Sequence, residues 1–168
     1  DRARKLGFAT SEVQISETET PLHRLETVYR RLTERLATAD TPQGALRNIV
    51  DGWFFTLEED VLAEGGIAAS DAQQLLQRTN DLLEQRLAKV TRLAPMFSAA
   101  LRGYRHAQAE GKVATAEGIL AWLAGQPNVA ANAKRYAGVK GDLDHFGALN
   151  FLQGILTVLR DTGQAGLL

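Results

Sequence analysis

The chain of 168 residues is 45% hydrophobic and 23% charged, the composition of an ordinary soluble globular protein. Its net charge of −1 favours no polyanionic partner for the chain as a whole, and the absence of cysteine excludes disulfides and thiolate metal sites. A cysteine-free chain fits a reducing compartment such as the cytoplasm, and no apolar run reaches the roughly 20 residues that a membrane span needs.

Two strand-like segments lie near the ends of the chain. Residues 8–16 follow a glycine that ends a short helical segment, and their apolar and polar side chains alternate imperfectly, as in a strand. A long amphipathic helix pattern stops at Gly163 and Gly166, and residues 166–168 then resemble the first step of a buried strand. Two strands this far apart need neighbouring strands, so we expect an internal region of a larger α/β protein.

Between these segments the apolar residues recur every three or four positions, the spacing of amphipathic helices. Thr20-Pro21, Thr41-Pro42 and Ser70-Asp71 each provide an N-cap residue, followed in two cases by proline at the first helical position. The expected helices are 20–36, 41–64, 70–94, 96–110, 115–124, 128–136 and 142–161, with a kink at Pro95. The sequence therefore predicts a mainly α fold, a helical bundle-like region with one or two short strands.

Two features predict where these helices pack closely. Trp53 and Phe54 belong to a wide apolar helical face, so we expect both side chains in the core. Gly147 and Gly154 lie inside the last helix, where glycine costs about 1 kcal/mol relative to alanine. Such glycines are typical of positions at which another element approaches closely.

The motifs of catalysis and nucleotide binding are absent from the sequence. The loop 138–141, Gly-Val-Lys-Gly, lacks the spacing and the following hydroxyl of a phosphate-binding loop, and we interpret it as an interhelical connection. Asp142, Asp144 and His145 form a local cluster that has two readings, metal ligands or a capped first helical turn. The cap, with Asp142 at the helix start, is the favoured interpretation, so the sequence predicts no metal site and no catalytic residue.

Charged residues are segregated along the chain. An acidic stretch contains no lysine or arginine and comprises Asp51, Glu58, Glu59, Asp60, Glu64 and Asp71. A basic set follows it and comprises Arg86, Lys89, Arg92, Arg102 and Arg105. The basic set is the candidate nucleic-acid surface, because such stripes can follow phosphates. The alternatives are a solvated helix face and ion pairs with the acidic stretch.

Four segments, 21–32, 146–152, 156–163 and 166–168, resemble the ATP-binding proteins of bacterial BREX phage-defence systems, the BrxC/BrxD-like family. By this resemblance, the last helix corresponds to the one that leads into the Walker B strand. The first residues correspond to the end of the helix that follows the Walker A loop. The resemblance covers the whole chain in order, but the family's nucleotide-binding lysine and Walker B acids have no matching positions here.

The resemblance implies a parent P-loop ATPase in which this chain is an insertion in, or a part of, the α/β domain. It implies ATP and Mg²⁺ as cofactors of the parent protein, none for the chain alone, and DNA, other defence-system subunits and further copies of itself as partners, with no membrane. The expected function is a helical region that couples nucleotide state to DNA or partner subunits. The alternative is a non-enzymatic helical scaffold for protein interaction.

Overall fold

In a computed structural model that describes residues 2–168, the chain forms nine helices. They are α1 (Arg2–Lys5), α2 (Leu25–Glu34), α3 (Leu46–Glu64), α4 (Ala72–Arg86), α5 (Ala88–Leu93), α6 (Pro95–Ala109), α7 (Val113–Leu123), α8 (Ala131–Ala137) and α9 (His145–Asp161). Pairing between extended segments of this part of the chain is limited to three isolated bridges. The predicted mainly helical fold class is therefore confirmed.

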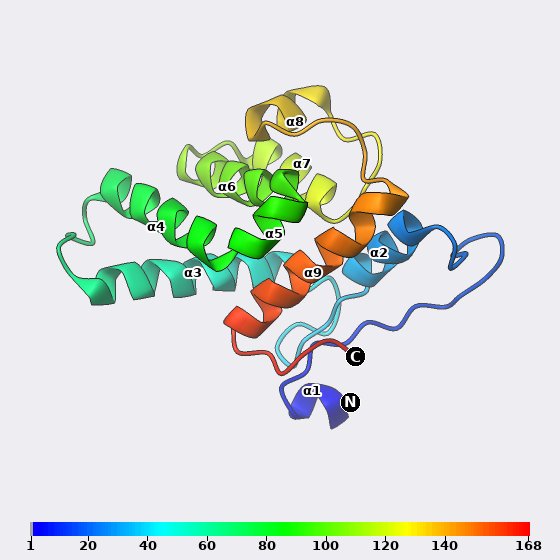
Figure 1. Ribbon diagram of the computed structural model, residues 1–168. Helices are drawn as coiled ribbons and strands as arrows, with labels where there is room; N and C mark the ends of the chain where they lie inside the picture. The colour runs from blue at the N-terminus through cyan, green and yellow to red at the C-terminus, as the bar shows by residue number, and fades with distance from the viewer. Residues whose placement is uncertain (1) are drawn as a thin grey trace.

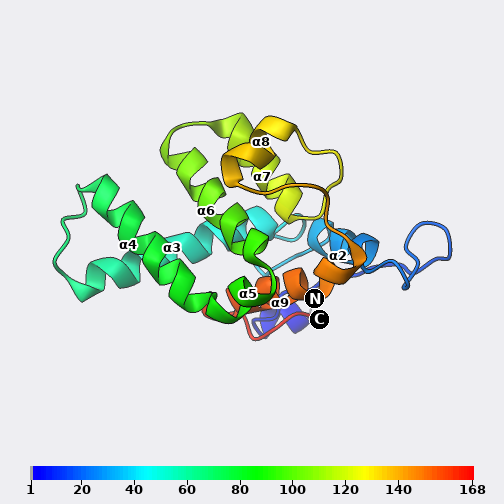
Figure 2. The same cartoon turned by 45° about the horizontal axis from the view of Figure 1, so that its top comes forward.

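Helix α9 crosses the body of the molecule and contacts α2, α3 and α5 (Figure 1). Helices α6, α7 and α8 pack on one another and form a second group of helices. Helices α3 and α4 run side by side as a hairpin that extends away from this body in both views (Figure 2). The first and last segments of the chain lie together at the side opposite α8 (Figure 1).

The core is centred on the aromatic ring of Phe151 on α9. The rings of Tyr29, Phe97 and Trp122 meet it edge to face, with centroid distances of 6.0, 5.3 and 5.6 Å. These three rings come from α2, α6 and α7, so one side chain of α9 joins three other helices. The Tyr29 hydroxyl donates a 2.7 Å hydrogen bond to the Leu123 carbonyl, and burial raises the pKa of Tyr29 above its usual range.

The predicted burial of Trp53 and Phe54 is confirmed, because their side chains are 0% and 2% exposed. Both lie on the buried face of α3, a helix that packs against α4 and α9. The predicted helix start at Ser70-Asp71 is confirmed, with Asp71 as the cap of α4, where it accepts a 3.1 Å hydrogen bond from the Gln74 N–H. Pro95 occupies the first turn of α6, where its missing N–H is not needed.

The predicted starts of α2 and α3 are wrong by about one turn. Thr20 lies in a bridge with Ser16, and its N–H donates to the Ser16 hydroxyl at 3.2 Å. The Thr41 N–H donates to the Thr38 hydroxyl, and its carbonyl accepts from the Thr38 N–H. Each threonine is thus engaged in a turn before the helix, a conformation that competes with N-capping. The predicted helix 70–94 is also divided, because the chain changes direction at the fully buried Leu87.

Gly154 confirms the prediction of close packing. A Cβ atom at this position would lie 2.5 Å from the Phe97 ring, which is itself fully buried. We expect Gly154→Ala to lower the free energy of unfolding by about 1–3 kcal/mol, because the ring has no space to move into. Urea denaturation of the variant measures this loss.

Gly52 on α3 provides the matched control for Gly154. It also lies inside a helix, but a Cβ atom there would meet no atom within 4 Å. Gly52→Ala should therefore raise the free energy of unfolding by up to about 1 kcal/mol through helix propensity alone. Equal effects of the two substitutions would contradict the role assigned to the contact between Gly154 and Phe97.

Candidate functional site

The N-terminal segment is paired with two other parts of the chain. The Ala9 N–H donates to the Gly166 carbonyl, and the Leu168 N–H donates to the Ala9 carbonyl, both at 3.0 Å. This is a parallel bridge between Ala9 and Leu167. On the other side, Thr10 and Ala37 exchange two 2.8 Å hydrogen bonds in an antiparallel bridge. The extent of the strands predicted at 8–16 and 166–168 stays a prediction.

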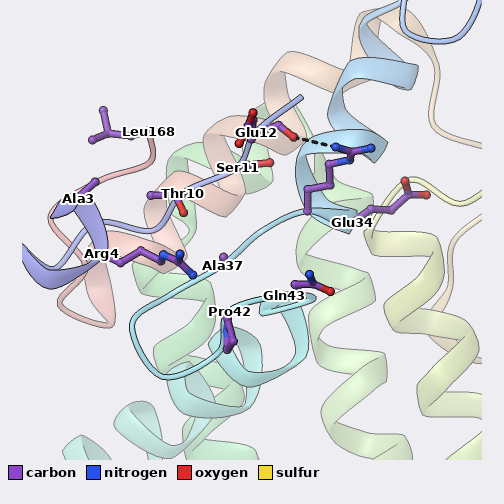
Figure 3. A pocket seen from close by; sticks show the side chains of 11 residues that line it. Ala3, Arg4, Thr10, Ser11, Glu12, Glu34, Ala37, Pro42, Gln43 and Leu168 are labelled. Carbon is purple, nitrogen blue, oxygen red and sulfur yellow. Dashed lines mark hydrogen bonds between the residues drawn. The ribbon is translucent and has the colours of Figure 1, made fainter. Parts of the chain in front are cut away.

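A cavity of about 670 Å³ opens beside these bridges (Figure 3). Its polar lining carries both signs of charge, from Arg4 and Arg35 and from Glu12 and Glu34. The Arg35 guanidinium donates to the Glu12 carbonyl at 3.4 Å. A wall of mixed charge does not select for a polyphosphate, so we assign no nucleotide to this cavity.

The side chain of Asp161, at the end of α9, forms hydrogen bonds with residues of two other helices. The carboxylate of Asp161 accepts a 2.7 Å hydrogen bond from the Trp53 indole N–H and two 2.8 Å hydrogen bonds from Arg86. The same guanidinium also donates to Asp60 at 2.8 Å. The hydrogen bond to Asp60, followed by the bonds and charge of Asp161, raises the pKa of Arg86 further above its usual range. We call these four residues the Asp161 junction; it ties α9 to α3 and α4.

A comparison with protein families identifies the family of this chain. The model of the family described as BREX system ATP-binding protein BrxC/D matches residues 1–168. The chain belongs to this family. The resemblance expected from the sequence is thereby confirmed. Comparisons with curated proteins and with solved structures gave no match.

In this BREX-family chain, three members of the basic set are engaged with carboxylates of the same chain. Arg86 pairs with Asp60 and Asp161, and Arg105 donates from Nε to Glu58 at 2.9 Å. Arg102 forms an ion pair with Glu84. Asp60 and Glu58 belong to the acidic stretch, so the alternative interpretation of ion pairs with that stretch holds for Arg86 and Arg105. These three side chains lie between helices and are partly buried.

Lys89 and Arg92 differ from the other members of the basic set. Both side chains are exposed on α5, and neither forms an ion pair within the part of the chain that the structure describes. These two cations remain available to an external anion. Contact of the basic set with DNA stays a prediction, and Lys89 and Arg92 are its most accessible members.

The acidic cluster at the start of α9 acts as a cap, with one correction. Asp144, not Asp142, is the N-cap residue, because its carboxylate accepts a 2.7 Å hydrogen bond from the Gly147 N–H. Asp142 instead accepts from the Asn128 N–H at 3.2 Å and holds the preceding loop. Among residues 2–168 there is no group of three or more metal-ligating side chains, and no helix there is long and apolar enough to cross a membrane.

We expect residues 1–168 alone to bind no ATP at micromolar protein concentration. The sequence lacks a Walker A lysine and a phosphate-cradling glycine loop, which supply most of the interactions with the β- and γ-phosphates. Titration calorimetry with ATP and Mg²⁺ measures this directly. Saturable binding with micromolar affinity would reveal a nucleotide site within the chain.

Proposed function

We propose that this chain is the helical region of a BREX-type P-loop ATPase that couples nucleotide state to DNA or to partner subunits. The parent protein uses ATP and Mg²⁺ in the cytoplasm and works with other subunits of the BREX system and with further copies of itself. Family membership supports the nucleotide and the system subunits. DNA, Mg²⁺ and the coupling role are the parts that experiments must test.

The Asp161 junction is the observation that carries this proposal. Asp161 is the last residue of α9, and a short turn joins it to the segment that pairs with Ala9. In the proposed protein, residues 8–16 and 166–168 lie in the nucleotide-binding sheet. A shift of that sheet would therefore reach the end of α9 first, and the hydrogen bonds of Asp161 would pass it to α3 and α4.

The hydrogen bonds of Arg86 would link a movement of α9 to the α3–α4 hairpin. Arg86 lies at the last position of α4, and its guanidinium spans two carboxylates on different helices. One nitrogen of this guanidinium donates to both oxygens of Asp161 and the other donates to Asp60, so the arrangement is sensitive to orientation as well as to distance. A small rotation of α9 is thus expected to change the position of the α3–α4 hairpin, which extends from the body (Figure 2).

The test of coupling uses the full-length protein with Asp161→Asn. The amide keeps an acceptor for Trp53 but loses the charge that holds Arg86. We expect ATP affinity to stay unchanged, whereas the ratio of DNA or subunit affinities with and without ATP should fall towards one. Couplings of this kind usually amount to about 5–150-fold. Fluorescence anisotropy with labelled duplex or subunit measures the ratio.

Asp81→Asn is the matched control, because Asp81 is an exposed carboxylate on α4 without a partner among the described residues. It should leave the ratio unchanged. A wild-type ratio retained in Asp161→Asn would refute the role of the junction. If ATP does not bind the wild-type protein at all, the scaffold alternative replaces the coupling function.

The DNA prediction is tested at the exposed pair Lys89 and Arg92. Replacing both with glutamine in the full-length protein should weaken duplex binding equally for all sequences, because phosphate contacts carry no sequence information. The slope of log K against log salt should flatten by up to about 1.8, at roughly 0.9 for each phosphate that is no longer neutralised. Adding Arg86→Gln would extend this to about 2.7 only if Arg86 leaves its carboxylates to contact phosphate.

The contradicting result is an unchanged affinity and salt slope in the double variant. Lys89 and Arg92 would then belong to a solvated helix face. Arg78→Gln is a suitable control for the loss of positive charge. Its guanidinium lies on α4 and pairs with Glu64 at the end of α3.

A further inference from the structure

The side of α6 that meets the α3–α4 hairpin carries basic residues. Arg105 and His106 lie three and four positions after Arg102, so the three side chains share one side of the helix. The sequence of α6 contains no aspartate or glutamate. This basic stripe is therefore not neutralised within its own helix, and its counter-charges come from elsewhere in the chain.

The hairpin supplies a carboxylate to each arginine of the stripe. Arg105 donates from Nε to Glu58 on α3 at 2.9 Å, and Arg102 forms an ion pair with Glu84 on α4. The four side chains are between 20% and 39% exposed, so solvent and a larger anion can reach both pairs. Ion pairs at this exposure contribute little to stability and are screened by salt. Each arginine can thus exchange its carboxylate for another anion at small cost.

The polar groups of α4 next to these pairs are incompletely satisfied. The side-chain amide of Asn80 contacts the His106 ring at 2.9 Å, but the other end of that amide is buried without a hydrogen-bond partner among residues 2–168. The same holds for the hydroxyl of Thr79, whose residue is fully buried. Water would satisfy both groups if α4 moved away from its neighbours, which lowers the free energy that such a movement requires.

We propose that the α3–α4 hairpin is an internal competitor of DNA for α6. The carboxylates of Glu58 and Glu84 occupy Arg102 and Arg105 as backbone phosphates would, because a guanidinium binds carboxylate and phosphate in the same way. A duplex therefore binds this side of α6 strongly only when the hairpin releases the arginines. The inference rests on the proposed function for the choice of DNA as the ligand, and it adds a masked surface and the element that masks it.

The test removes both competing carboxylates, with Glu58→Gln and Glu84→Gln together in the full-length protein without nucleotide. A labelled duplex should bind more tightly to this variant than to the wild type. The slope of log K against log salt should steepen by up to about 1.8, at roughly 0.9 for each additional phosphate that is neutralised. Fluorescence anisotropy over a range of salt concentrations measures both quantities, and far-ultraviolet circular dichroism confirms that the variant is folded.

The matched control is Glu59→Gln with Asp81→Asn. These two exposed carboxylates lie on the same two helices and remove the same charge, but neither forms an ion pair within residues 2–168. Affinity and slope should stay close to the wild-type values. An equal gain in the two double variants, a gain in neither, or no duplex binding by either would overturn the proposal.

The gain must also depend on the arginines that the carboxylates hold. Adding Arg102→Gln and Arg105→Gln to the variant without Glu58 and Glu84 should abolish the gain in affinity and in slope, because the released groups are then absent. A gain that persists in this fourfold variant would overturn the proposal. All these measurements are made without ATP, so their outcome is distinguishable from that of the coupling tested with Asp161→Asn.

Discussion

Replacing Trp53 with alanine is expected to lower the free energy of unfolding by about 3–5 kcal/mol. The side chain is fully buried, and its ring packs against Phe54 with a centroid distance of 5.4 Å. The substitution leaves a cavity between helices and also removes the donor that holds Asp161. Urea denaturation followed by far-ultraviolet circular dichroism measures the loss without depending on the tryptophan itself.

Phe55→Ala is the control for this experiment, because its side chain is on the same helix and 61% exposed. It should change the free energy of unfolding by no more than about 0.5 kcal/mol. A loss below about 1 kcal/mol in Trp53→Ala, or full quenching of Trp53 by acrylamide, would show that the assigned face is exposed.

Phe151→Ala should have an effect of similar size, again about 3–5 kcal/mol. Its ring meets the rings of Tyr29, Phe97 and Trp122, so its removal takes contacts from three helices at once. For a chain of this size the loss corresponds to a fall of about 6–20 °C in melting temperature. Differential scanning calorimetry of the variant provides the measurement.

Phe146 offers a control near the start of the same helix, with a side chain that is 86% exposed. Phe146→Ala should leave the melting temperature almost unchanged. Comparable losses in the two variants would mean that the aromatic cluster around Phe151 is not the centre of the core.

Features that depend on residues close together in the sequence could be predicted. The burial of Trp53 follows from helical spacing within α3, and the Asp71 cap is fixed by a bond to Gln74. The starts of α2 and α3 lie later than the sequence predicts, because Thr20 and Thr41 satisfy their polar groups in preceding turns. Local propensity does not distinguish these turns from helix caps.

The contacts of the candidate site could not be predicted from the sequence. The partner of Arg86 in the Asp161 junction lies 75 positions away, and no local pattern indicates that pairing. The basic set can be recognised in the sequence by its charge. Which arginines form ion pairs, and that Lys89 and Arg92 stay exposed, depends on how α4, α5 and α6 pack relative to α3 and α9. Family membership is visible in the sequence, since dispersed apolar and glycine positions record a fold even where no catalytic motif is present.

The bridge between Ala9 and Leu167 also has a mechanical consequence. Tension applied between the backbone of residues 7–11 and the backbone of residues 165–168 would be carried across the four hydrogen bonds that join these segments, which are Ala165 to Gly7, Ala9 to Gly166, Leu168 to Ala9 and Ser11 to Leu168. The helices between Ala9 and Leu167 would bear no load until those bonds break. These bonds would therefore act as a clasp that shields helices α2 to α9 from tension applied at the two segments.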